Sequence, residues 1–292
     1  MNEMKVSPEW IQTSLAAAMS LGLEKGKFYR NAQCTCLNIL LTYEEGCRAA
    51  CSYCGLSRVS HAEVPTFIRV KWPTYSMDEI LMQMQKHKHP FKRICISMIT
   101  NVRAMADTCS IIARFQDTGL PISVLVSPTV MQGKADLLRL KEAGADHIGI
   151  AVDAATRKLF GQHRGKGVSG PHDWDQYWQL VSDCVELFGP SYTGIHLIVG
   201  LGETEEEMIK TIARANCIGA STHLFSFFPE AGSLLEDHPQ PPMAQYRNVQ
   251  LARYLINNDI IQASAISFLS NGEVSDYGTD VDSIISLSLI HI

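Results

Sequence analysis

The sequence contains no apolar run of the roughly 18 residues that a membrane-spanning helix requires. Its first residues also lack the apolar core of a secretory signal peptide. Charged residues make up only 19% of the 292 residues, and acidic residues outnumber basic ones, which gives a net charge of −5. Nucleic-acid binding requires a basic surface. We therefore expect a cytoplasmic protein that binds neither membranes nor nucleic acid, with a large core built from its 46% of hydrophobic residues.

Two further absences concern cysteine. The nine cysteines are odd in number and do not have the regular spacing of a disulfide framework. This indicates a reducing environment in which some thiols bind metal. A second C-x2-C pair, which a structural zinc site usually needs, is missing as well. The sequence instead contains one cluster of three cysteines, Cys47, Cys51 and Cys54, at C-x3-C-x2-C spacing.

This cysteine triplet follows directly after an apolar run at residues 37–41. Thiolates are soft ligands that suit iron–sulfur clusters, zinc or copper(I). Three thiolates leave one iron of a four-iron cluster without a protein ligand, and such an open site implies chemistry at the metal. The alternative is a non-catalytic zinc protein in which another residue, such as Cys36, supplies a fourth ligand.

Six apolar segments rich in Ile, Val and Leu alternate with helical patterns, which predicts parallel strands buried on both faces. The expected strands are 37–43, 93–99, 122–127, 147–152, 193–199 and 222–228. The expected helices between them lie near 77–87, 103–117, 134–143, 171–187 and 203–216. Six units are too few to close an eight-stranded barrel. The expected fold class is therefore α/β, an open, partial (β/α)6 barrel of TIM type.

The chain is expected to have three parts. Residues 1–35 form an N-terminal helical extension, whose helix begins at Ser7-Pro8-Glu9. Residues 36–260 form the partial barrel, and residues 261–292 form a C-terminal segment. The last residues, 287–292, read like the translation of a sequencing adapter, so we expect this segment to be truncated near Ile285. The alternative is a genuine apolar terminal strand.

Polar groups follow the ends of the expected strands, where barrels of this kind carry their chemistry. These candidates are Ser97, Met98 and Thr100 after the second strand, Ser127 after the third, Asp153 after the fourth, and Gly200, Gly202 and Glu203 after the fifth. Asp153 fits an N-cap of a following helix equally well. The glycine pair by itself fits a tight turn from strand to helix.

Three other features have competing interpretations. Cys34 and Cys36 are either ordinary half-buried thiols or, because residues two apart share a face of a strand, a second metal or sulfur-handling site. The glycine-rich, basic segment 164–172 is either a mobile loop that meets an anionic group or a partner, or a flexible connection. Four cysteines in apolar contexts are expected to be inert buried thiols, namely Cys95, Cys109, Cys184 and Cys217.

Taken together, these residues resemble the radical S-adenosylmethionine (SAM) superfamily. The resemblance rests on Cys47, Cys51 and Cys54, with the aromatic Tyr53 before the last cysteine. The strand ends at 151–153 and 199–204 look like those of its biotin-synthase-like members. More narrowly, segments 41–47, 66–70 and 225–233 look like a lipoyl-synthase-type subgroup that works as a pair of related proteins.

The resemblance implies that the three thiolates hold a [4Fe–4S] cluster and that SAM binds its fourth iron. Reductive cleavage of SAM then yields a 5′-deoxyadenosyl radical, which abstracts hydrogen from an unactivated carbon. The resemblance also implies a role for each candidate: Tyr53 near the adenine; Ser97, Met98 and Thr100 at the methionine end of SAM; Ser127 and Asp153 at the ribose or substrate; and Gly200, Gly202 and Glu203 along the nucleoside.

The narrower resemblance implies a sulfurtransferase that inserts sulfur into a protein-bound octanoyl chain, as in lipoyl synthesis. Such an enzyme needs a sulfur source, usually a second cluster, for which Cys34 and Cys36 are the candidates. The implied partners are a reductant such as ferredoxin or flavodoxin, an octanoylated carrier domain and a paired homologous radical SAM protein. The alternative is another biotin-synthase-like reaction on a small molecule.

Overall fold

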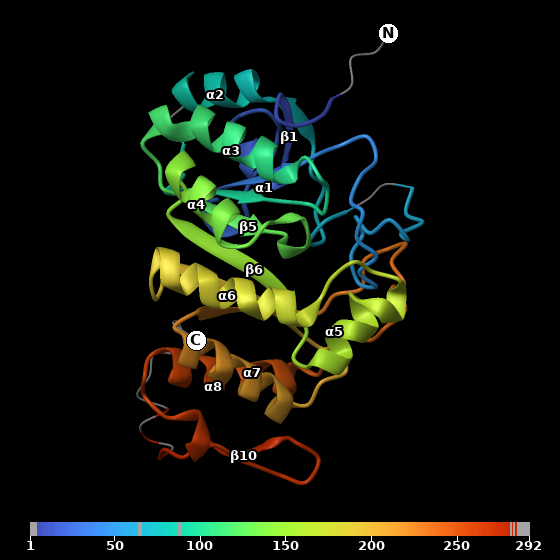
Figure 1. Ribbon diagram of the computed structural model, residues 1–292, viewed down its shortest axis with the longest axis vertical. Coiled ribbons are helices and arrows are strands. Elements are labelled where there is room, and N and C mark those ends of the chain that lie inside the picture. The colour runs from blue at the N-terminus through green and yellow to red at the C-terminus, as the bar shows by residue number, and fades with distance from the viewer. Residues whose placement is uncertain (1–4, 64–65, 87–88, 281, 283, 285–292) are drawn as a thin grey trace.

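The computed structural model describes residues 5–63, 66–86, 89–280, 282 and 284 (Figure 1). Residues 287–292, where we expected the mark of a truncation, lie outside the described residues. The centre of the molecule is a sheet of eight strands in the order β3-β1-β2-β4-β5-β6-β7-β8. The sheet therefore has two strands more than the six that were predicted.

Six of these strands are parallel and follow one another in chain order. They are β2 (Cys36–Leu41), β4 (Arg93–Ser97), β5 (Ile122–Val126), β6 (His147–Asp153), β7 (Thr193–Val199) and β8 (Ser221–Ser226). All six were predicted to within two residues at either end. Continuous runs of Ile, Val and Leu mark these strands because both faces of the sheet are covered.

The two additional strands, β1 (Trp10–Thr13) and β3 (Thr74–Ser76), are antiparallel and extend the sheet beyond β2. The prediction of a helix starting near Ser7 is therefore wrong for residues 10–13. In β1, buried Ile11 and Thr13 alternate with less buried neighbours, which is the two-residue period of a strand. The helix α1 (Leu15–Ser20) begins only after Ser14, whose side chain caps it.

The helices between the parallel strands lie where the pattern placed them, with one addition, α5. They are α2 (Met77–Lys86), α3 (Ala104–Phe115), α4 (Lys134–Ala143), α5 (Arg157–His163), α6 (Trp174–Phe188) and α7 (Glu205–Ile218), and α8 (Met243–Asn257) follows the last strand. Figure 1 shows most of them succeeding one another along the long axis in chain order. In the described part of the chain, no helix is long and apolar enough to cross a bilayer.

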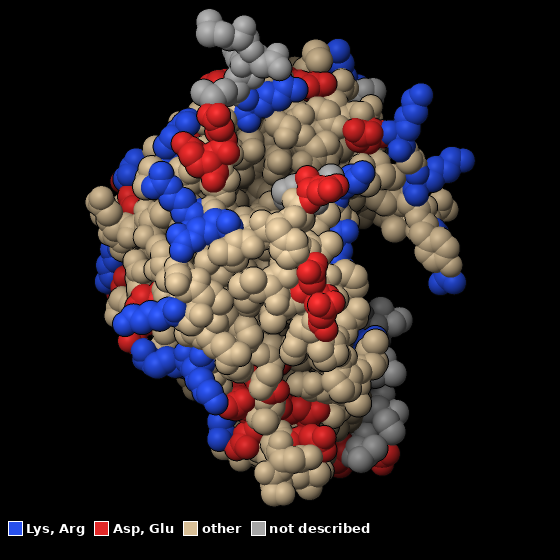
Figure 2. All heavy atoms as spheres, turned by 90° about the vertical axis from the view of Figure 1, so that its right-hand side faces the viewer, with Lys and Arg blue, Asp and Glu red and all other residues tan. Residues whose placement is uncertain are grey.

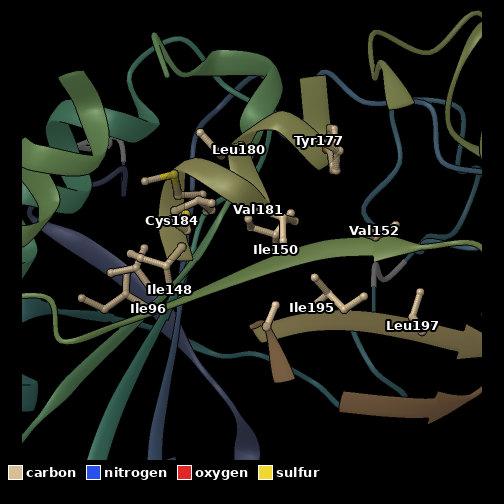
Figure 3. Close-up of a cluster of buried hydrophobic side chains, with 14 of the residues drawn as sticks. Ile96, Ile148, Ile150, Val152, Tyr177, Leu180, Val181, Cys184, Ile195 and Leu197 are labelled. Atoms are coloured by element: carbon tan, nitrogen blue, oxygen red, sulfur yellow. The ribbon is translucent and has the colours of Figure 1, made fainter. Parts of the chain in front are cut away.

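This order of strands has a consequence for the interior. Right-handed crossovers that always advance to the next strand bring their helices to the same face of the sheet. On that face, Ile148 and Ile150 of β6 pack against Leu180 and Val181 of α6 (Figure 3). The opposite face is left to enclose an interior space.

The C-terminal segment is attached to the start of α7. It contains the short antiparallel strands β9 (Ser267–Phe268) and β10 (Val274–Asp276). The buried Glu205 carboxylate accepts hydrogen bonds from the Val274 backbone N–H (2.7 Å) and from the Asn248 side chain of α8 (3.0 Å). One acidic side chain thus joins α7, α8 and this segment.

Candidate active site

The interior face of the sheet lines a cavity of about 770 Å³. Side chains point toward it from every parallel strand, because alternate residues of a strand face opposite sides: on β4, Cys95 and Ser97 line the cavity while Ile94 and Ile96 are buried on the other face. Much of the wall is apolar and aromatic, including Phe67, Trp72, Leu125, Phe225 and Phe227.

The loop that carries the cysteine triplet follows β2 and lies against the carboxyl ends of the parallel strands. The Arg48 N–H donates to the Thr100 carbonyl (2.8 Å) after β4, and the Ser52 N–H donates to the His163 carbonyl (2.9 Å) at the end of α5. The His163 ring also contacts the Ser52 hydroxyl (2.9 Å) and the Leu201 carbonyl (3.1 Å). These contacts hold the loop at the strand ends.

The three cysteines share one small apolar cluster. Cys51 is buried and Cys47 and Cys54 are half-buried, and all three pack with Tyr53 and with residues that follow β7 and β8. Cys54 lines the large cavity, and Cys47 lines a neighbouring cavity of about 240 Å³. The loop thus separates two hollow spaces at the end of the sheet.

The donor set of the triplet fits an iron–sulfur cluster, because three thiols meet in apolar surroundings where they influence one another's charge. Burial raises the pKa of Cys51 and of Cys54, and the charges of the neighbouring thiols raise both further. In the part of the chain that the structure describes, no group of three or more His, Cys, Asp or Glu side chains is arranged to hold a metal ion. Binding a cluster must therefore draw the sulfurs together and release their protons.

Asp153 occupies an unusual backbone position at the end of β6. The register between β6 and β7 shifts at this point, and Asp153 has a φ of 63°. The Ala154 N–H donates to the Val152 carbonyl (2.8 Å), which makes Asp153 the centre of a tight three-residue turn. Such bulges re-aim a side chain at the rim of a barrel, and here the Asp153 carboxylate faces the cavity. It does not cap a helix, since α5 begins at Arg157 with Thr156 as its N-cap.

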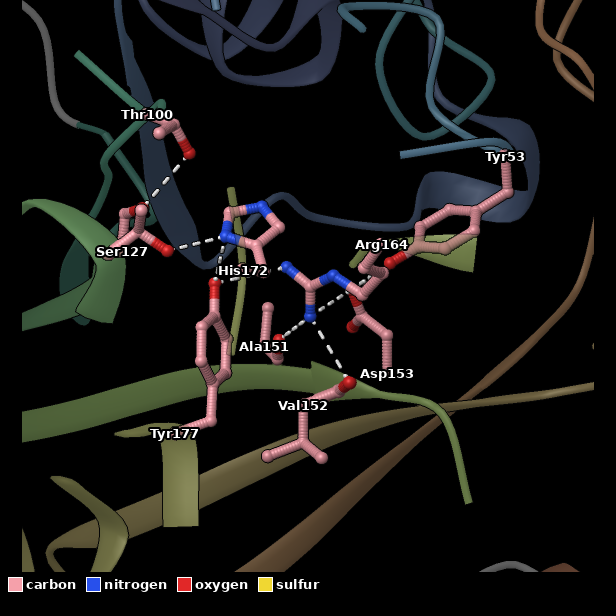
Figure 4. Close-up of polar contacts among 10 residues, drawn as sticks. Tyr53, Thr100, Ser127, Ala151, Val152, Asp153, Arg164, His172 and Tyr177 are labelled. Carbon is pink, nitrogen blue, oxygen red and sulfur yellow. Dashed lines mark hydrogen bonds and ion pairs between the residues drawn. The ribbon is translucent and has the colours of Figure 1, made fainter. Parts of the chain in front are cut away.

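A buried arginine, Arg164, joins the end of β6 to the cysteine loop (Figure 4). Its guanidinium contacts the Asp153 carboxylate (3.1 Å) and donates to the carbonyls of Ala151 and Val152. The Tyr53 hydroxyl donates to the same carboxylate (2.5 Å). Burial opposes the charge of Arg164, but neighbours such as Tyr53 raise its pKa, so the side chain is cationic.

The positive charge of Arg164 also affects the pKa of Cys51 in the triplet. It counteracts the effect of burial on Cys51 by lowering the pKa of that thiol through charge and hydrogen bonding. The Arg164 cation therefore connects the cysteine loop with the strained Asp153 turn and with the end of α5.

A second polar layer lies behind Arg164. The Tyr177 hydroxyl of α6 contacts Arg164 (3.4 Å) and the His172 ring (2.9 Å), and the Thr129 hydroxyl contacts the same ring nitrogen (2.6 Å). Burial, with a smaller contribution from Arg164, lowers the pKa of His172 to about 2. His172 is therefore neutral, and it is buried in this network together with Arg164 and Tyr177.

The turn after β7 is held together by its own side chain. Gly200 has a φ of 109°, and a Cβ there would lie 2.7 Å from Pro241. The Glu203 carboxylate accepts from the N–H groups of Gly200 (2.6 Å) and Leu201 (2.9 Å). Burial raises the pKa of Glu203, and these N–H groups act in the opposite direction. These contacts agree with the tight-turn interpretation.

The structure brings some of the predicted site residues to the cavity and leaves others behind its wall. Those that line it are Tyr53, Cys54, Ser97 and Asp153. Residues outside its lining are Cys47, Cys51, Met98, Thr100, Ser127, Gly200, Gly202 and Glu203. Thr100 and Ser127 contact each other through their hydroxyls (3.0 Å). The roles of all these predicted site residues toward a cofactor stay predictions.

Several residues that shape the site could not be found from the sequence. Segment 164–172 was interpreted as a mobile loop or a flexible connection, yet Arg164 and His172 at its two ends are buried in the network described above. The signal for Arg164 is weak, because its partner Asp153 is 11 positions away and is re-aimed by a bulge. Cys95 was expected to be inert and buried, but it is half-buried and lines the cavity.

The wall of the cavity is completed by the segment before β3. The Glu230 carboxylate, which follows β8, accepts hydrogen bonds from the Thr66 hydroxyl and from the Arg69 N–H (2.7 Å). Figure 2 shows the side of the molecule on which these loops lie, and charges of both signs are scattered there among uncharged residues. Glu230 thus links the two chain segments that flank the cysteine loop.

The chain matches one family model, which is described as the radical SAM superfamily, over residues 42–215. No curated protein sequence matches this chain. Among solved structures, methylornithine synthase has 14% identity and a TM-score of 0.58, covering 83% of this chain and 66% of that one. HydG, a maturase of the FeFe-hydrogenase, has 14% identity and a TM-score of 0.56, covering 83% of this chain and 53% of that one. This chain thus spans between half and two thirds of their lengths, and the likeness shows the fold alone.

The buried pair of Arg164 and Asp153 generates a prediction about stability. Arg164→Met removes the charge and leaves a carboxylate unpaired in the interior, so the free energy of unfolding should fall by about 3–5 kcal/mol in urea denaturation. Arg157→Met is the matched control, because Arg157 begins α5, the helix that Arg164 follows, and pairs with Asp175 at the exposed surface; this variant should unfold at nearly the same urea concentration as the wild type. Asp153→Asn added to Arg164→Met should restore part of the loss. Equal effects of the two arginine variants would contradict the role of Arg164.

The neutral His172 generates a prediction about pH. Its pKa is about 2 in the folded protein and about 6.5 in the unfolded chain. The folded pKa is the lower one, so its contribution to stability is complete above pH 6.5 and is lost as the pH falls, by up to about 1.4 kcal/mol per pH unit. His172→Gln should make the free energy of unfolding less steep between about pH 6 and pH 4. A His172→Gln curve as steep as the wild-type curve would refute the prediction.

Proposed function

This chain belongs to the radical SAM superfamily, and we propose that it is an enzyme that cleaves SAM reductively at a [4Fe–4S] cluster held by Cys47, Cys51 and Cys54. When bound, the cluster and SAM supply a 5′-deoxyadenosyl radical, which takes a hydrogen atom from an unactivated carbon. One observation carries the proposal: the triplet loop lies at the carboxyl ends of six parallel strands, beside a cavity that Tyr53, Cys54 and Asp153 line. In β/α folds this edge carries the chemistry.

The residues of the chain would contribute binding, orientation and exclusion of water. The three thiolates would hold three irons and leave the fourth open to SAM. Tyr53 and Asp153 are fixed to each other, so we propose that their cavity-facing surfaces orient the nucleoside or the substrate. Ser97 would contact SAM from the wall of the cavity, with Met98, Thr100 and Ser127 behind it, while Gly200, Gly202 and Glu203 would shape the turn along the nucleoside.

We further propose that the chemistry is of the biotin-synthase-like, lipoyl-type kind, in which sulfur is inserted into an octanoyl chain on a carrier domain. The support is the apolar, aromatic part of the open barrel, where Phe67, Trp72 and Phe225 suit a hydrocarbon chain. The enzyme would then receive electrons from a ferredoxin or flavodoxin and work with a paired homologous radical SAM protein. Its nine free cysteines suit the reducing cytoplasm.

The cluster is tested by anaerobic reconstitution with iron and sulfide. Wild-type protein should become brown and, once reduced with dithionite, form 5′-deoxyadenosine from SAM. Cys51→Ala should lose both properties, because a site with two thiolates cannot hold the cluster open to SAM. Cys184→Ala is the control, since this buried cysteine of α6 lies away from the triplet. A colourless protein that binds zinc and leaves SAM intact would overturn the proposal in favour of a zinc-binding protein.

The substrate is tested separately with the reconstituted enzyme. Incubation of the reduced protein and SAM with an octanoylated carrier domain should add sulfur to the acyl chain, as a mass increase of about 32 Da per inserted thiol. A carrier domain without the octanoyl group is the control. Formation of 5′-deoxyadenosine without any sulfur on the acyl chain, with and without the paired protein, would retain the radical chemistry and refute the lipoyl-type reaction.

A further inference from the structure

A second pair of thiols lies inside the barrel, away from the cysteine triplet. Cys36 on β2 and Cys95 on β4 come from neighbouring parallel strands, and their sulfur atoms are 2.9 Å apart. The Cys95 sulfur is also 2.8 Å from the Ser123 hydroxyl on β5, its direct partner across the sheet. Cys95 lines the same 770 Å³ cavity as Tyr53 and Cys54. A small molecule in the cavity can therefore reach this sulfur.

The surroundings of Cys95 are those of a reactive thiol. The Cys36 thiol donates to its sulfur, Ser123 supplies a second hydrogen bond, and Arg93 lies two residues away on the same strand. The hydrogen bond from Cys36 is the largest influence and, with Ser123 and Arg93, lowers the pKa of Cys95 to about 7 against the effect of burial. The thiolate is the nucleophilic form of cysteine.

The other thiol of this region, Cys34, is engaged differently. Its sulfur donates to the backbone carbonyl of Cys36 (3.2 Å). From the sequence, we expected Cys34 and Cys36 to act together because they are two residues apart. In the structure, the sulfur-to-sulfur contact instead joins Cys36 to Cys95 across the sheet.

We propose that Cys95 is a sulfur-accepting nucleophile that takes up a sulfane sulfur atom from a persulfide donor, with Cys36 as its proton partner and resolving thiol. This use of the site rests on the proposed sulfur insertion, for which it would hold sulfur within the substrate cavity. The uptake itself needs neither the cluster nor SAM.

Transfer of the sulfane sulfur to Cys95 needs no oxidant. The Cys95 thiolate attacks the outer sulfur of a donor R–S–SH, a bond forms between Cys95 and that sulfur, the donor S–S bond breaks, and the leaving thiolate R–S⁻ takes up a proton. When nothing consumes the persulfide, Cys36 attacks the Cys95 sulfur, a disulfide forms between the two cysteines, and hydrosulfide leaves with a proton. An added thiol reduces this disulfide and restores the pair.

The experiment exposes the reduced, full-length protein to glutathione persulfide without air, then alkylates it and maps its peptides by mass spectrometry. Wild-type protein should carry the added sulfur on Cys95 first and later release hydrosulfide as the disulfide with Cys36 forms. In Cys36→Ser, the persulfide on Cys95 should accumulate and persist. In Cys95→Ser, hydrosulfide release should fall to the background of the reagent.

Cys109→Ser is the matched control, because Cys109 is also half-buried but lies on α3; this variant should behave like the wild type. Circular dichroism confirms that each variant is folded. Sulfur found on Cys109 or on the exposed Cys217 but not on Cys95 would overturn the proposal, as would equal hydrosulfide release by the wild type and Cys95→Ser. Cleavage of SAM by the reconstituted wild type is measured in parallel, so that failure of sulfur uptake is distinguished from failure of the radical chemistry.

Discussion

The site depends on one buried guanidinium. Arg164 binds the Asp153 carboxylate and two backbone carbonyls of β6, contacts Tyr177 of α6 and influences Cys51 of the triplet loop. A charge inside a protein is tolerated only when partners replace the water it has lost. The partners of Arg164 come from three separate parts of the chain, so its solvation requires that they be assembled correctly. This requirement also holds Asp153 in a strained turn that faces the cavity.

The cavity is a consequence of how the sheet is wound. Six parallel strands advance in chain order, which places their helices on one face and leaves the other face to enclose a space. The helix-facing side is packed with Ile, Leu and Val, whereas the inner side carries Cys95, Ser97 and Ser123 next to aromatic residues. In the proposed function, the apolar part of this wall would hold the hydrocarbon chain and the polar part would hold the cofactor.

Cys54 of the triplet and Cys95 both line this space, and the two groups of thiols to which they belong differ in their surroundings. The triplet lies at the strand ends among apolar residues, where burial raises the pKa of Cys51 and Cys54 and favours the uncharged thiols. Cys95 lies on the inner face of the sheet beside donors that lower its pKa. The first environment suits metal ligation, in which the metal displaces the protons, and the second suits nucleophilic attack. In the proposed function, one cavity would connect radical generation with sulfur transfer.

Local patterns along the chain were enough to predict the six parallel strands and all the helices between them except α5, and to single out the triplet with Tyr53, because each of these signals lies within a few consecutive residues. The strand β1 was missed because Ile11 fits a helical period with Leu15 as well as a strand period with Thr13. The partners of Arg164 and the contact between Cys36 and Cys95 could be known only from the fold. Arg164 meets Asp153 across a bulge, and Cys36 meets Cys95 across 59 positions. Such contacts leave no periodic pattern in the sequence, because they follow from strand register and from the need to solvate a buried charge.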